Sequence, residues 1–269
     1  MIEQHKQFGV EHASIFNDDS VVAAYVNRPP YVSETFELLA TLIDQSSTPR
    51  AILDAGCGLG QMASGLLPYA ERIDAVDISA AMIEASKQLS CGTDPRINWI
   101  EGGIEKVDLQ PPYSMIVTAA SLHWMPWEIT LPRFAQVLSQ NGYLAIVEGR
   151  SAKDAWADEL SPLFARYSMN RDFQPYNMLT IATELEEHGL FQQVGMLEAK
   201  PKPFRQSLDA WIEAIFSRNG FSRERMDAEQ AAEFEQQVRN VLIKYCPDGI
   251  VEQAIGSRII FGKPLMHMG

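Results

Sequence analysis

The chain has 269 residues, of which 46% are hydrophobic and 21% charged, a composition typical of a globular protein with a packed core. Its formal net charge of -13 argues against a protein that holds nucleic acid through a basic surface. No apolar run approaches the roughly 20 residues that cross a bilayer, and Met1–Glu11 lacks the order of a signal peptide, so we expect a cytoplasmic protein without a membrane partner.

From residue 51 onward, short apolar runs alternate with helical patterns, which is the order expected of βαβ units and a parallel sheet. Ala51–Asp54 is predicted as a buried strand that ends at a glycine cluster, and Ser79 is predicted to cap a later helix. A third helical stripe is expected to end at Asn141–Gly142, a pair suited to a left-handed cap. The pattern predicts a doubly wound α/β sheet with strands at residues 51–54, 73–77, 97–100, 115–118 and 143–147.

The second half of the chain is less regular. Residues 150–178 are rich in aromatic residues and arginine, and they are predicted as an inserted lid of helix and loop. A helix stopped by Gly189 and a sixth strand over 191–197 follow. Two amphipathic helices come next, and they must bury their apolar faces, most simply as a cap on the sheet domain. Residues 257–262 have the composition of a closing strand.

The glycine cluster, with the sequence Gly-Cys-Gly-Leu-Gly, lies between the first strand and a helix. Glycines at this place let the backbone turn sharply and let a ligand approach the free N–H groups. Asp77 ends the next strand, where a carboxylate can accept hydrogen bonds from both hydroxyls of a ribose. The loop and the carboxylate together predict a ligand that contains adenosine.

The spacing within the loop separates two classes of adenosine-bearing cofactor. A dinucleotide loop would have a third glycine at position 61, where this chain has Gln61. Asp54, two residues before the first glycine, suits the ammonium group of an amino-acid moiety better than a pyrophosphate. A structural role in capping the loop is the alternative for Asp54. A nicotinamide oxidoreductase is therefore disfavoured.

Three stretches resemble the class I S-adenosylmethionine-dependent methyltransferases, namely Ile52–Gly60, Ala75–Ser79 and Thr118–Trp124. Tyr25 and Arg28–Pro30 resemble the N-terminal region of the family, so the likeness covers residues 21–150, and 189–197 continues it. The helical insertion at 204–256 is similar to that of the small-molecule branch that includes trans-aconitate methyltransferase.

This resemblance implies a mostly parallel seven-stranded sheet whose last strand is antiparallel, with a helical cap inserted before that strand. It implies an N-terminal helical segment over the cofactor site (1–50), a core (51–200), a cap (201–257) and a final strand (258–269). The implied cofactor is S-adenosylmethionine and the product is S-adenosylhomocysteine. The three cysteines lie far apart, and they predict neither a disulfide framework nor a metal site.

The resemblance also implies individual roles at the cofactor: the glycines for the methionine portion, Asp77 for the ribose and Ala119 beside the sulfonium. Many relatives have an aspartate at the position of Gly103 that bonds the adenine amino group. Here that recognition is expected to rest on backbone groups or on Glu105. The residues expected to bind the cofactor are Tyr25, Arg28, Asp54, Gly56, Gly58, Gly60, Asp77, Ile78, Gly103, Ile104 and Ala119.

The methyl acceptor is expected next to the segment that follows the fourth strand. His123 lies there, and an imidazole suits a general base near neutral pH. The alternative is that the segment Leu-His-Trp only shapes the pocket. The predicted acceptor pocket contains His123, Trp124, Arg150 and Trp211. The candidates for a bidentate contact with a substrate carboxylate are Arg28, Arg150, Arg166 and Arg171.

These observations predict transfer of a methyl group from S-adenosylmethionine to a small-molecule acceptor. The acceptor atom is an oxygen, nitrogen or carbon nucleophile, and a carboxylate is one of the candidates. The alternative is a protein that binds S-adenosylmethionine without transferring its methyl group, either as a non-methylating enzyme or as a sensor. The expected partner is a small molecule rather than nucleic acid, and the sequence leaves the oligomeric state open.

Overall fold

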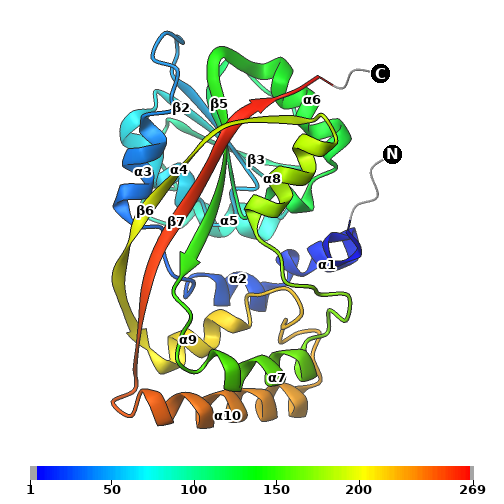
Figure 1. Ribbon diagram of the computed structural model, residues 1–269, viewed down its shortest axis with the longest axis vertical. Helices are drawn as coiled ribbons and strands as arrows, with labels where there is room; N and C mark the ends of the chain where they lie inside the picture. The colour runs from blue at the N-terminus through cyan, green and yellow to red at the C-terminus, as the bar shows by residue number, and fades with distance from the viewer. Residues whose placement is uncertain (1–4, 267–269) are drawn as a thin grey trace.

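The computed structural model describes residues 5–266, which form one sheet with helices on both faces and a helical subdomain beyond one end of it (Figure 1). The strands are β1 (Ala51–Ala55), β2 (Arg72–Asp77), β3 (Ile97–Glu101), β4 (Tyr113–Ala119), β5 (Leu138–Ser151), β6 (Phe191–Ser207) and β7 (Ile250–Pro264). The predicted segments 1–50 and 258–269 include residues 1–4 and 267–269, which lie outside the described residues.

Helices occupy most of the connections between these strands. The α-helices are α1 (Val10–Ala13), α2 (Asp19–Tyr25), α3 (Ser33–Ala40), α4 (Gln61–Leu66), α5 (Ala80–Lys87), α6 (Trp127–Val137), α7 (Ala157–Tyr167), α8 (Met178–Glu187), α9 (Leu208–Ile215) and α10 (Ala228–Tyr245). The 3-10 helices are η1 (Lys6–Phe8), η2 (Ser14–Asn17), η3 (Leu67–Tyr69) and η4 (Leu122–Trp124). The predicted cap of α5 is confirmed, since the Ser79 hydroxyl accepts a hydrogen bond from the Met82 N–H at 3.1 Å.

The strand order is β3-β2-β1-β4-β5-β7-β6. Strands β1 to β5 are parallel, whereas β7 runs antiparallel to both β5 and β6. The expectation of a mostly parallel, seven-stranded, doubly wound sheet with an antiparallel last strand is thus confirmed. The chain reverses its direction across the sheet between β1 and β4, and a crevice at the carboxyl ends of such strands is the usual ligand site of an open α/β sheet.

Neighbouring residues on the central strands supply two separate apolar cores. Ile52 and Met115 belong to the cluster that includes residues of α3 and α4. Leu53 and Ile116 belong to the cluster that includes residues of α6 and α8. Because successive strand residues point to opposite faces and both faces are covered, these strands read as continuous apolar runs without polar alternation.

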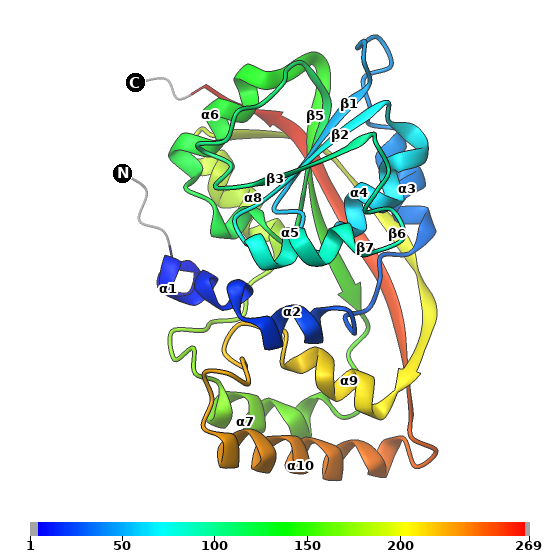
Figure 2. The same ribbon diagram turned by 180° about the vertical axis from the view of Figure 1, so that it is seen from behind.

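The helices α7, α9 and α10 form a subdomain of their own beyond the carboxyl edge of the sheet, with α2 lying between them and the sheet (Figures 1 and 2). Phe234 of α10 is fully buried at the centre of this subdomain. Its ring centroid lies 5.8 Å from that of Phe216, 5.1 Å from that of Phe221 and 5.2 Å from that of Tyr167. The subdomain therefore has an apolar core separate from the two cores of the sheet.

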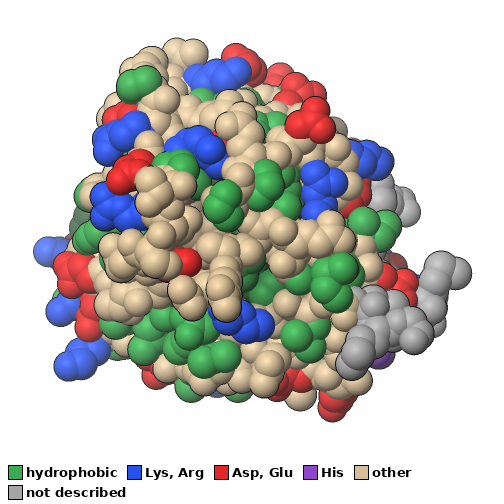
Figure 3. All heavy atoms as spheres, turned by 90° about the horizontal axis from the view of Figure 1, so that it is seen from above, with side chains coloured by type: hydrophobic (Ala, Val, Ile, Leu, Met, Phe, Trp, Pro, Cys, Tyr) green, Lys and Arg blue, Asp and Glu red, His purple; other side chains and the backbone are tan. Residues whose placement is uncertain are grey.

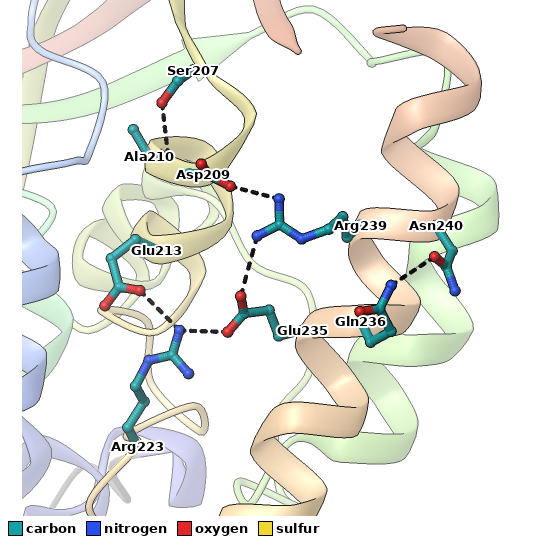
Figure 4. A network of polar contacts seen from close by, with 9 residues as sticks. All are labelled: Ser207, Asp209, Ala210, Glu213, Arg223, Glu235, Gln236, Arg239 and Asn240. Atoms are coloured by element: carbon teal, nitrogen blue, oxygen red, sulfur yellow. Dashed lines mark hydrogen bonds and ion pairs between the residues drawn. The ribbon is translucent and has the colours of Figure 1, made fainter.

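A polar network connects α9 with α10 (Figure 4). The Arg223 guanidinium lies between the carboxylates of Glu213 and Glu235, at 2.9 and 3.0 Å. Glu235 also accepts a hydrogen bond from Arg239 at 3.2 Å. Because exposed ion pairs contribute only about 0–1 kcal/mol each, we assign this partly exposed network mainly to the orientation of the two helices.

Strands β6 and β7 run much further than the sequence pattern predicts. Their pairing continues past a bulge between Ala199 and Lys202 as far as Ser207, which faces Ile250. Residues 200–207 are polar and contain two prolines, which is why they were not recognised as a strand. Proline is tolerated here because β6 is an edge strand. The predicted cap at 201–257 therefore consists of α9 and α10 mounted on a ribbon of two strands.

The expected helix end at Asn141–Gly142 is wrong. Helix α6 ends at Val137, and β5 begins at once with Leu138, which pairs with Tyr113 of β4. Gly142 is required there for a different reason, because a Cβ atom on it would lie 2.8 Å from the carbonyl oxygen of Ser114. Close approach of two backbones, rather than left-handed geometry, explains this glycine.

The end of the molecule away from the helical subdomain carries acidic and basic side chains interspersed with apolar ones (Figure 3). Within residues 5–266 no helix has both the length and the apolar character that crossing a bilayer requires.

The core of the helical subdomain predicts the effect of one truncation. Phe234→Ala should lower the free energy of unfolding by about 3–5 kcal/mol, because it removes a fully buried ring and leaves a cavity. The matched control is Gln236→Ala, two residues further along α10 on its exposed side, which should change stability by less than about 0.5 kcal/mol. Urea denaturation measures both, and equal stabilities of the two variants would contradict a packed subdomain core.

Candidate active site

A pocket opens at the carboxyl edge of the sheet, between the ends of β1, β2 and β4 and the N-terminal helices. The space within it is about 790 Å³ when the open mouth is included. It is lined by Ala13, Phe16, Tyr25, Gly56, Gly58, Val76, Asp77, Ile78, Met82, Gly102, Gly103, Ile104, Glu105, Ala119, Ala120, Ser121, Trp124, Met125 and Pro126. Eight of the eleven residues expected at the cofactor are among them.

The N-terminal segment covers one side of this pocket. Ile15 and Val21 are buried against Leu59 of the glycine loop and Met82 of α5. The Ser79 hydroxyl also donates a hydrogen bond to the carbonyl of Phe16 at 2.7 Å. These contacts hold η2 and α2 against the glycine loop and α5.

The three glycines of the loop all have left-handed backbone angles, with φ of 76° at Gly56, 51° at Gly58 and 73° at Gly60. A Cβ atom on Gly60 would lie 2.4 Å from the ring of Trp99, so this glycine is needed for packing, and it does not line the pocket. A Cβ atom on Gly58 would have open space, with the Tyr25 hydroxyl at 3.6 Å. Gly58 is thus the part of the loop where a ligand can approach the backbone.

The carboxylate of Asp77 holds the loop in place. It accepts hydrogen bonds from the N–H of Gly58 at 2.7 Å and from the N–H of Ser79 at 2.9 Å. Burial raises the pKa of Asp77, although these backbone hydrogen bonds act in the opposite direction. Each carboxylate oxygen retains a lone pair after these bonds, so Asp77 can still accept a further hydrogen bond from a ligand in the pocket.

Asp54 lies beneath the loop and is only 1% exposed. One carboxylate oxygen accepts a hydrogen bond from the N–H of Ala63, in the first turn of α4, at 3.0 Å. The other oxygen has no hydrogen-bond partner among residues 5–266. Burial raises the pKa of Asp54 to about 7, and the charge of Asp77 adds to the shift. The expected capping role is therefore observed, while Asp54 does not line the pocket.

Gly103 stands where many relatives have an aspartate, and the side chain of Glu105 lies next to it. A Cβ atom on Gly103 would lie 2.5 Å from a carboxylate oxygen of Glu105. The side chain of Glu105 therefore occupies the space that a side chain at position 103 would fill, and Glu105 lines the pocket together with Gly103 and Ile104.

The end of β4 forms the opposite wall of the pocket. Ala120 has a φ of 51°, an uncommon value for a residue other than glycine, and its N–H donates to the carbonyl of Val147 at 3.0 Å. The Ser121 hydroxyl donates to the carbonyl of Ala55 at 2.6 Å and fixes the turn against the glycine loop. Strained backbone of this kind is typical of functional sites.

His123 is 2% exposed and stands behind the pocket wall rather than in the lining. Its Nε2 shares a hydrogen bond with the hydroxyl of Tyr176 at 3.0 Å, and its ring packs against Phe8 and Trp124. Burial lowers the pKa of His123 to about 3. An imidazole with that pKa is a poor base near neutral pH, so the geometry favours the alternative in which this segment shapes the pocket.

Arg28 is half-buried beside the pocket and outside its lining. Its guanidinium stacks on the ring of Tyr25, 4.0 Å from the centroid. Its Nε donates to the hydroxyl of Ser217 at 2.7 Å, and a terminal nitrogen donates to the carbonyl of the same residue at 2.6 Å. Arg28 therefore connects the wall of the pocket with the segment that follows α9.

Two residues predicted for the acceptor pocket, Arg150 and Trp211, lie elsewhere. Arg150 is exposed on the sheet and pairs with Glu198 at 2.8 Å. Trp211 is buried in the core of the helical subdomain, and its indole N–H donates to Gln253 at 3.0 Å. Trp211 lies outside the pocket because the long β6–β7 ribbon carries α9 away from the sheet edge, and Arg150 lies outside it on β5, where it pairs with Glu198.

Two further arginines suggested for a carboxylate also have other contacts. Arg166 pairs with Glu233 at 3.6 Å, and Arg171 donates to the carbonyls of Ala165 and Arg166. Of the four arginines suggested, only Arg28 lies next to the pocket.

None of the three cysteines lines the pocket. Cys57 is buried under the glycine loop, and burial raises the pKa of its thiol well above the usual value. Among residues 5–266, no group of three or more His, Cys, Asp or Glu side chains could hold a metal ion.

Some lining residues were missed by the sequence reasoning. Phe16 and Met82 reach the pocket only through the packing of the N-terminal segment on α5, which no local pattern reveals. Ser121 is a small residue after a strand and carries no distinguishing signal. Tyr176 belongs to the predicted lid, and aromatic enrichment was the only signal for its contact with His123.

Comparison with known proteins adds a domain assignment. Residues 52–142 match a family model described as a methyltransferase domain. A malonyl-acyl-carrier-protein O-methyltransferase of Halalkalibacterium halodurans is 37% identical over 110 residues, which are 38% of this chain and 40% of that protein. An enzyme of the same name from Yersinia pestis is 25% identical over 207 residues, 70% of this chain and 73% of that protein. The match thus spans about two fifths of the length of the more similar of these relatives.

Solved structures agree with the fold. A structure described as a type II methyltransferase from Anaeromyxobacter dehalogenans covers 89% of this chain and 99% of its own, with a TM-score of 0.63 and 23% identity. A methyltransferase from an antibiotic biosynthesis pathway of Anabaena variabilis covers 88% and 99%, with a TM-score of 0.57 and 15% identity. Residues 52–142 thus match a methyltransferase domain, and the strand order and the glycine loop with Asp77 are those expected from the resemblance to the class I S-adenosylmethionine-dependent methyltransferases.

Proposed function

We propose that this chain transfers the methyl group of S-adenosylmethionine to an oxygen of a small acceptor that carries a carboxylate. The observation that carries the proposal is the convergence of the glycine loop, Asp77 and the end of β4 on one pocket, within the matched methyltransferase domain. Oxygen is chosen over nitrogen and carbon because the relatives are named as O-methyltransferases of a malonyl group held by a carrier protein. A malonyl group ends in a free carboxylate.

The residues of the pocket fit the cofactor. The open backbone at Gly58 suits the methionine portion, and the unpartnered oxygen of Asp54 suits its ammonium group. Asp77 retains lone pairs for the ribose hydroxyls. Ile104 suits the adenine ring, and the Glu105 carboxylate takes the place of the family's aspartate toward the adenine amino group.

When bound, S-adenosylmethionine supplies an electrophilic methyl group on its sulfonium. The chain then has two tasks, which are to hold the acceptor oxygen in line with that methyl group and to exclude water. A carboxylate acceptor is already ionised at neutral pH, so no general base is required. The absence of a need for a base agrees with the burial and the lowered pKa of His123. Trp124 then serves as a wall of the acceptor pocket.

Turnover separates this proposal from the alternative of a protein that binds the cofactor without transferring its methyl group. The relatives are named for transfer, which favours the enzyme. The test is release of S-adenosylhomocysteine when the protein receives S-adenosylmethionine and fractions of small carboxylic acids or acyl-carrier proteins. We expect product with acid-bearing fractions and none after esterification of the acids. Cofactor binding without product from any fraction would favour the non-transferring alternative.

The assignment of Asp77 to the ribose predicts a loss of cofactor affinity. Asp77→Ala should weaken binding of S-adenosylhomocysteine by about 1.5–3 kcal/mol, or roughly tenfold to a hundredfold, because a charged hydrogen-bond acceptor is lost. The matched control is Glu101→Ala, since Glu101 pairs with Asp77 in register at the end of β3 and lies outside the pocket. Calorimetric titration measures both affinities. Unchanged affinity in Asp77→Ala would contradict the assignment of Asp77 to the ribose.

The raised pKa of Asp54 predicts a pH dependence of binding. Below pH of about 7 the free protein holds Asp54 protonated, whereas a bound ammonium group favours the carboxylate. Binding should therefore release a proton, and affinity for S-adenosylhomocysteine should rise between pH 5.5 and 7 by up to about tenfold per pH unit. Asp54→Asn cannot titrate and should flatten this slope. Equal slopes in the two proteins would exclude contact between Asp54 and the ligand.

A further inference from the structure

Arg218 follows α9 in the helical subdomain, and it is exposed. The residue before it, Ser217, accepts two hydrogen bonds from Arg28, which itself stacks on Tyr25. The Tyr25 hydroxyl lies next to the open side of Gly58. A short series of contacts therefore leads from the glycine loop through Tyr25 and Arg28 to the segment that carries Arg218.

The guanidinium of Arg218 has no hydrogen-bond or ion-pair partner within the described chain. A guanidinium carries five N–H donors, yet no oxygen within residues 5–266 accepts a hydrogen bond from this one. Its Cζ atom lies 6.0 Å from the centroid of the Phe164 ring, which is a distant cation–π contact. The side chain nevertheless retains exposed surface. An arginine that is accessible and unpaired has its donors available for a ligand.

The surroundings of Arg218 favour an anion. Burial by the surrounding chain lowers its pKa to about 10, and the positive charge of Arg28 acts in the same direction. The acidic neighbour Asp154 acts in the opposite direction, but it forms no ion pair with Arg218 among the described residues, and one of its carboxylate oxygens accepts a hydrogen bond from Gln253 at 2.7 Å. Two neighbouring cations repel each other, and a bound anion relieves that repulsion.

The other side of this region is formed by the segment after β4. Arg28 acts electrostatically on Tyr176 as well as on Arg218. The hydroxyl of Tyr176 bonds to His123, which follows β4 next to the pocket residue Trp124. Arg28 is therefore within electrostatic range of both Arg218 and Tyr176, the partner of His123.

We propose that Arg218 binds a carboxylate of the methyl acceptor, so that the helical subdomain selects acidic acceptors. The planar fork of a guanidinium matches the two oxygens of a carboxylate. The cofactor also has a carboxylate, but Arg28, stacked on Tyr25 beside the glycine loop, is nearer to its expected position. The inference rests on the proposed function, because it assumes that the acceptor binds between the end of β4 and the subdomain.

The test is direct binding of small carboxylates to the intact protein. Malonate, succinate and citrate are titrated by calorimetry into protein saturated with S-adenosylhomocysteine. We expect at least one to bind, and Arg218→Met to weaken it by roughly tenfold to a hundredfold, with a smaller loss in Arg218→Lys. The matched control is Arg205→Met, since Arg205 is exposed and pairs with Glu252 at 3.4 Å. The control should leave carboxylate affinity unchanged.

A second readout separates binding from structural support. Removing an unpaired cation next to Arg28 relieves repulsion, so Arg218→Met should keep or raise the melting temperature while it loses carboxylate affinity. A lower melting temperature together with lost affinity would indicate a structural role and overturn the proposal.

The remaining outcomes are also decisive. An equal loss of S-adenosylhomocysteine affinity in Arg218→Met would assign the residue to the cofactor's carboxylate, and unchanged carboxylate affinity would overturn the proposal as well. So would a wild-type protein that binds none of the three acids. If S-adenosylhomocysteine itself does not bind, the proposed function fails, and the same titrations without it still decide whether Arg218 holds a carboxylate.

Discussion

Asp54 and Asp77 stand at the ends of neighbouring parallel strands, where Asp54 is buried and Asp77 is half-buried in the pocket lining. Asp54 accepts the N–H of Ala63 in the first turn of α4, and Asp77 accepts the N–H of Gly58. The two bonds fix the middle of the glycine loop and the helix that follows it, and the loop in turn positions the pocket. Burial of two like charges costs stability. A cation placed between the loop and these carboxylates would offset that cost, so the apo protein is prepared for a positively charged ligand.

The rest of the site is built against this loop from parts of the chain that are distant in sequence. Ser121 fixes the end of β4 to the carbonyl of Ala55, and Ile15 packs the N-terminal segment onto Leu59. The pocket is therefore made by the sheet and the N-terminal segment, whereas the proposed acceptor contact of Arg218 comes from the helical subdomain. Such a division lets acceptor preference change without disturbing the cofactor site.

Much of this arrangement could be predicted from local patterns. The strand Ala51–Ala55, the glycine loop and Asp77 follow one another in a fixed order, so their meeting at one edge of a parallel sheet follows from topology. Arg150 and Trp211 were misplaced because their positions depend on how far β6 and β7 extend, and residues 200–207 have no apolar alternation. The free guanidinium of Arg218 is a tertiary property, since the sequence does not reveal which arginines find partners.

The length of the β6–β7 ribbon sets the distance between the sheet and α9. Beyond the bulge after Ala199, six residue pairs from Lys202 to Ser207 separate the sheet from α9. At about 3.3 Å per residue they set a spacing of about 20 Å. Because side chains alternate between the two faces of a ribbon, this spacing can change only in steps of two residues on each strand if Val251 and Ile255 are to stay buried. Paired insertions or deletions in this ribbon would therefore move α9 relative to the sheet in increments of about 7 Å.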